Sequence, residues 1–106
     1  MTNKITKKQH DQACVEYDKA LDQEQSCLRN VVYHVTLVNM AQTKLLEQSR
    51  FSTTRFYDEN DVPRFACVVN KLVEATDLLR EAVKVKNGSW YKAMTLGMTL
   101  QKQERE

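Results

Sequence analysis

Apolar side chains recur at alternating spacings of three and four residues along the first half of the chain. Polar residues interrupt this row at only two places, Glu24 and Gln42. Such a heptad pattern is typical of the packed face of a helix, and it predicts a long N-terminal helix. Thr6 followed by Gln9 is a capping-box sequence that would start this helix. The full row is Cys14, Tyr17, Leu21, Glu24, Leu28, Val31, Val35, Val38, Gln42 and Leu45.

The stretch NVVYHVTLVNM at residues 30–40 is the most apolar part of the chain and is rich in β-branched residues. Read as a strand, it would alternate its side chains between two faces and would need partner strands. Read as a helix, it keeps Val31, Val35 and Val38 in phase with positions on both sides. Because β-branched content alone is a weak argument for a strand, we expect a helix here.

Residues 6–50 contain no Gly or Pro, and the sequence leaves open whether they form one helix or two. One helix would be about 67 Å long, whereas a compact domain of this size is only about 33 Å across. Compactness therefore favours a break at the polar residues 22–26, where Ser26 could cap a new helix. The uninterrupted spacing favours a single helix whose overhang a second chain covers.

Residues 52–61, STTRFYDEND, are polar and lack periodicity, and we expect them to connect two helices. Asp61 followed by Pro63 is a good helix start, since a carboxylate can cap the helix and proline suits its first turn. The second long helix is predicted from about residue 62 to residue 86, with Asn87-Gly88 as its stop signal. Its apolar row is Phe65, Val68, Leu72, Ala75, Leu79 and Ala82.

The C-terminal part allows two interpretations. The first is a short C-terminal helix that Ser89 would cap. The second is a hairpin turn at Asn87-Gly88, followed by strand-like alternation over residues 94–100. We expect an all-α helical bundle in a single domain, residues 1–106, and an α+β fold with a C-terminal hairpin is the alternative. The apolar face of the helical interpretation would hold Trp90, Ala93, Met94 and Leu100.

Composition and charge narrow the function classes. The 106 residues carry 16 basic and 14 acidic side chains, and a net charge of +2 is too balanced to predict nucleic-acid or membrane binding. The start, MTNKITKKQ, has no apolar run after its lysines, so we expect no signal peptide, and no stretch is apolar enough to predict a membrane span. Three widely spaced cysteines then indicate reduced thiols in a cytoplasmic protein.

Candidate catalytic and metal-binding groups are sparse. His10 and Cys14 share one helical turn, but the sequence offers no second pair of ligands beside them. Glu74 and Asp77 lie on one side of the second helix, and they would need another acidic pair to hold a magnesium ion. We therefore expect no enzyme activity, no metal and no cofactor. A small metal-dependent helical enzyme is one alternative.

Basic and aromatic residues are interleaved around the predicted connection, a pattern that can bind nucleic acid. Asp58, Glu59 and Asp61 lie among them and cancel much of the positive charge. A nucleic-acid-binding regulator that uses residues 50–64 is therefore a second alternative and not the main prediction.

The predicted function is that of a non-enzymatic protein–protein interaction module, an adaptor or a small regulator or inhibitor, that presents a helical surface. The heptad surface exceeds what one small chain needs, so the expected partners are a second copy of the chain and one larger protein. Leu28 and Leu72 are predicted core residues. Truncating either one to alanine should lower the free energy of unfolding by about 2–5 kcal/mol. The residues predicted to form the interaction surface are Val31, His34, Val35, Val38, Arg50, Arg55, Phe56, Tyr57 and Arg64.

Overall fold

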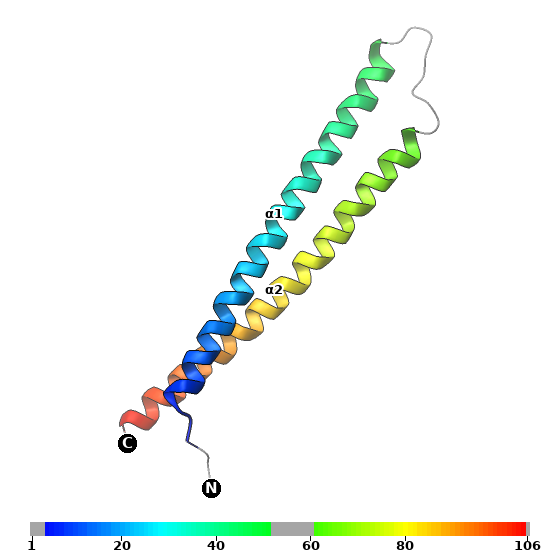
Figure 1. Ribbon diagram of the computed structural model, residues 1–106. Coiled ribbons are helices and arrows are strands. Elements are labelled where there is room, and N and C mark those ends of the chain that lie inside the picture. Colours follow the sequence, from blue (N-terminus) through cyan, green and yellow to red (C-terminus); the bar gives the residue numbers. More distant parts are fainter. Residues whose placement is uncertain (1–3, 52–60, 106) are drawn as a thin grey trace. The chain divides into compact units, whose positions relative to one another are not determined.

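The computed structural model describes residues 4–51 and 61–105, with side chains described for residues 4–47 and 62–105. It contains two helices of 45 residues each, α1 (Lys7–Phe51) and α2 (Asp61–Arg105) (Figure 1). No strand occurs within these two described ranges. The prediction of an all-α fold is therefore confirmed, and the alternative with a C-terminal β-hairpin is wrong.

The chain divides into two compact units, and each unit takes part of both helices. The first unit combines Met1–Ser26 with Arg80–Glu106, and the second is Cys27–Leu79. In the first unit the two helices run antiparallel. The Gln103 side chain bonds both backbone groups of Ile5, with N···O distances of 3.0 and 2.9 Å. The prediction of one domain over residues 1–106 stays a prediction.

The start of α1 is the capping box that the sequence predicts. The Gln9 backbone N–H donates to Thr6 Oγ1 at 3.2 Å, and the Thr6 backbone N–H donates to Gln9 Oε1 at 2.8 Å. These two reciprocal bonds satisfy donors that a helix N-terminus would otherwise leave without a partner. The predicted cap of α2, the Asp61 carboxylate, lies outside the described side chains, but α2 does begin at Asp61 with Pro63 in its first turn.

Helix α1 is continuous through residues 22–26, where the sequence left its course open, and through residues 30–40, where the predicted helix is confirmed. The polar residues 22–26 lie within it, so the predicted break is absent. The β-branched residues 30–40 are helical too, and Thr36 Oγ1 donates to the Val32 carbonyl at 3.1 Å. This bond keeps the hydroxyl satisfied inside its own helix. Continuity of the heptad spacing was therefore the better guide than local composition.

The predicted stop of the second helix at Asn87-Gly88 is wrong, and no separate C-terminal helix exists. Helix α2 passes through both residues to Arg105, and its described glycines have no positive φ angle. A glycine in a helix costs only about 1 kcal/mol relative to alanine. The packed positions of α2 continue on both sides of Gly88 in an unbroken heptad, which outweighs that cost.

The face along which the two helices pack, called here the seam, differs by one position from the predicted row on α1 and contains the whole predicted row on α2. Leu28, Val35 and Gln42 are exposed, whereas Cys27, His34 and Ala41 beside them are half-buried. In heptad terms the seam uses positions a and d, and the predicted row combined a with e. On α1 the seam is His10, Ala13, Tyr17, Ala20, Glu24, Cys27, Val31, His34, Val38, Ala41 and Leu45. On α2 it is Phe65, Val68, Leu72, Ala75, Leu79, Ala82, Lys86, Ser89, Ala93, Leu96, Leu100 and Gln103.

The buried core of the chain is small. Among the described residues, the buried apolar side chains are four alanines, and no large side chain is fully buried. Leu28 in particular is exposed in the single chain, so it is not a core residue there. Its truncation to alanine should therefore cost the single chain less stability than the sequence predicted. The four alanines are Ala13, Ala20, Ala75 and Ala82, all of them seam residues.

Candidate interaction surface

The seam of the first unit contains an ion pair. Lys86 Nζ lies 3.0 Å from Glu24 Oε2, and both side chains are largely shielded from solvent. Glu24 Oε2 accepts no hydrogen bond of good geometry from any described residue. The contact with Lys86 is therefore an attraction between opposite charges and not a well-aligned hydrogen bond. Polar residues at seam positions reduce stability but fix which positions of two helices can pair. Glu24, which the sequence showed only as an interruption, is therefore a half-buried seam residue paired with Lys86.

His10 fits into the seam because the facing residue has no side chain. A Cβ atom built on Gly97 would lie 3.0 Å from His10 Nε2, closer than normal packing allows. The same nitrogen lies 3.6 Å from Cys14 Sγ. His10 is thus a half-buried packing residue.

His34 occupies a seam position in the second unit. Its Nδ1 atom is buried and has no hydrogen-bond partner in the described structure. Its ring meets the Tyr33 ring edge-on, with centroids 5.3 Å apart and an interplanar angle of 71°. His34 was predicted to lie on the interaction surface, whereas the structure places it at a half-buried position of the seam.

One side of the second unit exposes apolar residues without any charge, and we call it the uncharged face. It consists of the e and b positions, which flank the seam, and its exposed large residues include Leu28, Val32, Leu46 and Val73. In an antiparallel helix pair the e positions of both helices flank the same side of the seam, as the g positions flank the other. The described members are Leu28, Val32, Val35, Asn39, Gln42, Leu46, Val62, Ala66, Val69, Val73 and Thr76.

The charged side chains that the structure describes in the second unit all lie on other sides of the helices. Every described charge in Cys27–Leu79 falls at an f, g or c position. This segregation means that the uncharged face is not a random sample of a protein surface, where single apolar residues lie among charges. The charged residues are Arg29, Lys44, Glu47, Arg64, Lys71, Glu74 and Asp77.

The residues predicted to form the interaction surface lie in different places. Val31, His34 and Val38 are half-buried in the seam. Val35 belongs to the uncharged face, and Arg64 is exposed at a g position on the opposite side. The side chain of Arg50, together with Arg55, Phe56 and Tyr57, lies outside the described residues. The five described members thus do not form one surface, and the predicted set as a whole stays a prediction.

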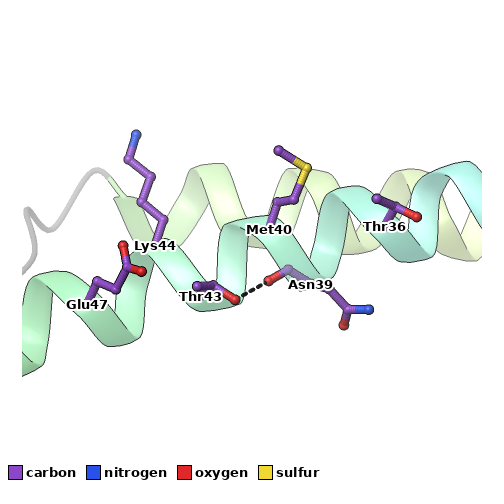
Figure 2. Close-up of a pocket in the computed structure, with 6 residues that line it drawn as sticks. All are labelled: Thr36, Asn39, Met40, Thr43, Lys44 and Glu47. Carbon is purple, nitrogen blue, oxygen red and sulfur yellow. Dashed lines mark hydrogen bonds between the residues drawn. The ribbon is translucent and has the colours of Figure 1, made fainter.

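Two concave regions accompany these surfaces. The first, of about 430 Å³, lies along α1 and is lined by residues of that helix alone (Figure 2). Its Thr43 hydroxyl donates to the Asn39 carbonyl at 2.9 Å, while the Met40 and Lys44 side chains project together on one side. A small-molecule site normally encloses most of its ligand. Residues of a single helix cannot enclose a ligand, so we interpret this region as an open surface.

The second concave region, of about 420 Å³, lies in the first unit near the start of α1. Ile5, Ala13 and Leu96 give it an apolar floor, and Lys8 and Lys92 stand at its edge. Lys92 Nζ also lies 3.5 Å from Glu16 Oε2, so one of these two cations already has an acidic neighbour. No arrangement of converging polar groups here defines a particular ligand.

The described side chains include no group of three or more His, Cys, Asp or Glu that could hold a metal ion. Glu74 and Asp77 are both exposed. None of the three cysteines, which all lie within the described residues, forms a disulfide. Within the described ranges, neither helix has an apolar stretch long enough to cross a membrane.

No known protein family, curated protein or solved structure matches this chain. The uncharged face is therefore the strongest basis for assigning a function, because it is the feature that ordinary surface composition explains least. Sequence reasoning missed it as a surface because it assigned Leu28 to the core and grouped Val35 with the seam residues Val31 and Val38. The signal was present, however, in the lack of any charge at every seventh residue from Leu28 and from Val32.

Proposed function

We propose that this chain is a non-enzymatic protein–protein interaction module that forms a homodimer through the uncharged face. The observation that carries the proposal is the complete segregation of charge away from this face in Cys27–Leu79. The dimer would then act as an adaptor, or as a small regulator or inhibitor, by presenting its remaining helical surfaces to a larger protein.

The exposed area of the chain supports association. The chain exposes 8837 Å², whereas a folded monomer of 12.4 kDa is expected to expose about 6,100 Å². The excess, about 2,700 Å², is of the order that each protomer of an obligate dimer removes from solvent. Since no large described side chain is fully buried, the single chain also lacks the core that its apolar content could form.

A second copy is the occupant that the charge pattern favours. In a two-fold symmetric dimer the same patch meets itself, so a charged residue on it would be buried against the same patch of the second copy, and near the two-fold axis against its own copy. The uncharged face avoids this cost, because none of its described members is charged. Burying each large apolar side chain there would contribute on the order of 1.5–3 kcal/mol.

We also propose a cytoplasmic location, which fits the absence of a disulfide among Cys14, Cys27 and Cys67. Reduced cysteines persist in the cytosol and are oxidised in secreted proteins.

The test is the solution mass of two matched variants, measured by size-exclusion chromatography with light scattering. Leu46 lies on the uncharged face and Leu78 lies at a g position of the same unit, and their exposed fractions are 61% and 59%. We expect the unmodified protein to have about twice the mass of 12.4 kDa. Leu46→Glu should convert it to a monomer, because the glutamate would be buried against a second copy.

Leu78→Glu is the control, and it should remain dimeric. A monomeric unmodified protein at micromolar concentration would overturn the proposal. Dissociation by Leu78→Glu but not by Leu46→Glu would place the interface on the other side and would also contradict it. Circular dichroism should show equal helicity for both variants, which separates dissociation from unfolding.

A further inference from the structure

The outer side of α2 in the first unit carries a row of residues spaced seven apart. Lys84, Tyr91, Met98 and Arg105 all occupy f positions, which point away from the seam, and all four are exposed. We call this row the basic-ended stripe. Seven residues are close to two helical turns, so the four side chains lie nearly in line over about 32 Å.

The middle of the basic-ended stripe is apolar. Met94 lies between Tyr91 and Met98 at the spacing of three and four residues that places side chains beside one another, and Trp90 lies alongside. All four side chains are exposed. Tryptophan and tyrosine are enriched among the residues that dominate binding energy, and methionine adapts its shape to different partners. An exposed cluster of these residue types is therefore suited to docking a partner.

The charged residues of α2 between Glu81 and Glu104 all have one sign. Residues 82–103 contain four lysines and no Asp or Glu. Lys86 and Lys92 are paired with α1 glutamates in the same unit, at 3.0 and 3.5 Å. The basic groups that face outward are Lys84 at one end of the stripe, and Lys102 and Arg105 at the other.

Acidic residues near the stripe lie on its flank and just before its first residue. Asp11 and Asp18 on α1 occupy exposed b positions, on the side of the seam where Trp90 lies, and Glu104 lies at an e position of α2. Glu81 occupies an exposed c position three residues before Lys84. The potential is therefore most positive over the f and c positions from Lys84 to Arg105, which limits an acidic partner to this part of the outer side of α2.

We propose that the basic-ended stripe docks an amphipathic helix of another protein, one with apolar residues at its centre and acidic residues at both ends. Its apolar centre would cover Tyr91, Met94 and Met98, and its acidic ends would meet Lys84 and Arg105. This mode is that of a helix bound through anchors at regular helical spacing. The proposal names the chemistry of the larger partner, and it does not require the uncharged face to form a dimer.

A protein partner is favoured over a lipid surface. A helix that lies in a membrane interface needs a broad apolar side. Here the exposed positions beside the apolar centre include the polar residues Asn87, Thr95 and Gln101. The apolar strip is thus about as wide as one partner helix requires. Anionic vesicles nevertheless share the complementary charge, and they form a separate arm of the test.

The test uses Trp90 as the reporter, because it is the only tryptophan in the chain. The probe is a synthetic helical peptide of about 21 residues, the length that spans the stripe, with leucines at its centre and glutamates at both ends. We expect a saturable blue shift of Trp90 emission with this peptide at low salt, weakened by added salt. A second peptide with lysines in place of the glutamates should not bind.

Met98→Glu and Met40→Glu are matched variants, since their side chains are 64% and 63% exposed. Met98→Glu should weaken binding by about tenfold or more, the loss typical of an anchor residue, and Met40→Glu should change it less than about twofold. The proposal is overturned if neither peptide binds, if the lysine peptide binds equally well, or if Met40→Glu is as harmful as Met98→Glu. Binding to vesicles of phosphatidylserine and phosphatidylcholine, without binding to the acidic peptide, would overturn it in favour of a lipid surface.

The two proposals fail in different ways. Loss of the dimer in Leu46→Glu leaves the basic-ended stripe intact, because Leu46 and Met98 belong to different units. The peptide titration should therefore give the same result with Leu46→Glu as with the unmodified chain.

Discussion

At the scale of single residues, the two glycines of α2 perform different tasks. A Cβ atom built on Gly88 would meet nothing within 4 Å, whereas one built on Gly97 would lie 3.0 Å from His10 Nε2. Neither glycine has a positive φ angle, so backbone conformation requires neither of them. Gly97 makes room for the imidazole of His10, and Gly88 has no packing reason to be glycine.

Gly88→Ala should therefore stabilise the protein by about 0.8–1 kcal/mol, the difference in helix propensity between the two residues. Urea unfolding followed by circular dichroism would measure it as a higher midpoint at unchanged slope. A loss of stability would show that the backbone at Gly88 is not helical in solution.

Gly97→Ala gains the same helix propensity but must displace the His10 ring. We expect a smaller stabilisation than at Gly88, or a net destabilisation, because the added methyl group is too close to Nε2. In a His10→Ala background the obstacle is removed, and Gly97→Ala should then stabilise by about 0.8–1 kcal/mol again. Equal effects of Gly97→Ala in both backgrounds would contradict the contact between these residues.

At the scale of the helices, two ion pairs join α1 and α2 in the first unit and differ in shielding. The Glu24 and Lys86 side chains in the seam are 16% and 23% exposed, and those of Glu16 and Lys92 are 45% and 61% exposed. Water screens the second pair, which also has the longer N···O distance, 3.5 Å against 3.0 Å. The seam pair should therefore carry most of the electrostatic coupling between the two helices.

Double-mutant cycles with Glu24→Gln and Lys86→Met should give a coupling energy of about 1–3 kcal/mol, since breaking either side leaves the other charge in the seam. The matched cycle with Glu16→Gln and Lys92→Met should give less than about 0.5 kcal/mol, as for exposed pairs in general. Replacing both seam residues by leucine should preserve stability but weaken the preference for this register. A larger coupling energy for the exposed pair would contradict the assignment.

At the scale of the whole molecule, stability and association should be coupled. If the single chain buries little more than alanines, the free energy of dimerisation forms a large part of the free energy of folding. The thermal midpoint should rise with protein concentration for the unmodified chain, and it should be lower and independent of concentration for Leu46→Glu. Circular dichroism at protein concentrations a hundredfold apart would measure this. A concentration-independent midpoint in the unmodified protein would contradict the homodimer.

The sequence by itself determined the two long helices, the capping box at Thr6 and the all-α class. These follow from local rules, namely spacing, caps and the lack of helix breakers, which act within a few residues. Continuity of α1 through residues 22–26 was also available from the unbroken heptad phase. Continuity of α2 through Gly88 was available in the same way, but the local stop signal was given too much weight.

Only the tertiary structure decided which of two adjacent rows on α1 forms the seam. Leu28 and Cys27, like Val35 and His34, are neighbours about 100° apart on the helix, and a heptad row can pass through either. Hydrophobicity favoured the leucine and the valine, but burial depends on where α2 lies. The structure places the cysteine and the histidine in the seam and leaves Leu28 and Val35 exposed. That one-position shift, fixed by the packing of two helices, turns an expected core into the surface proposed to bind a second copy.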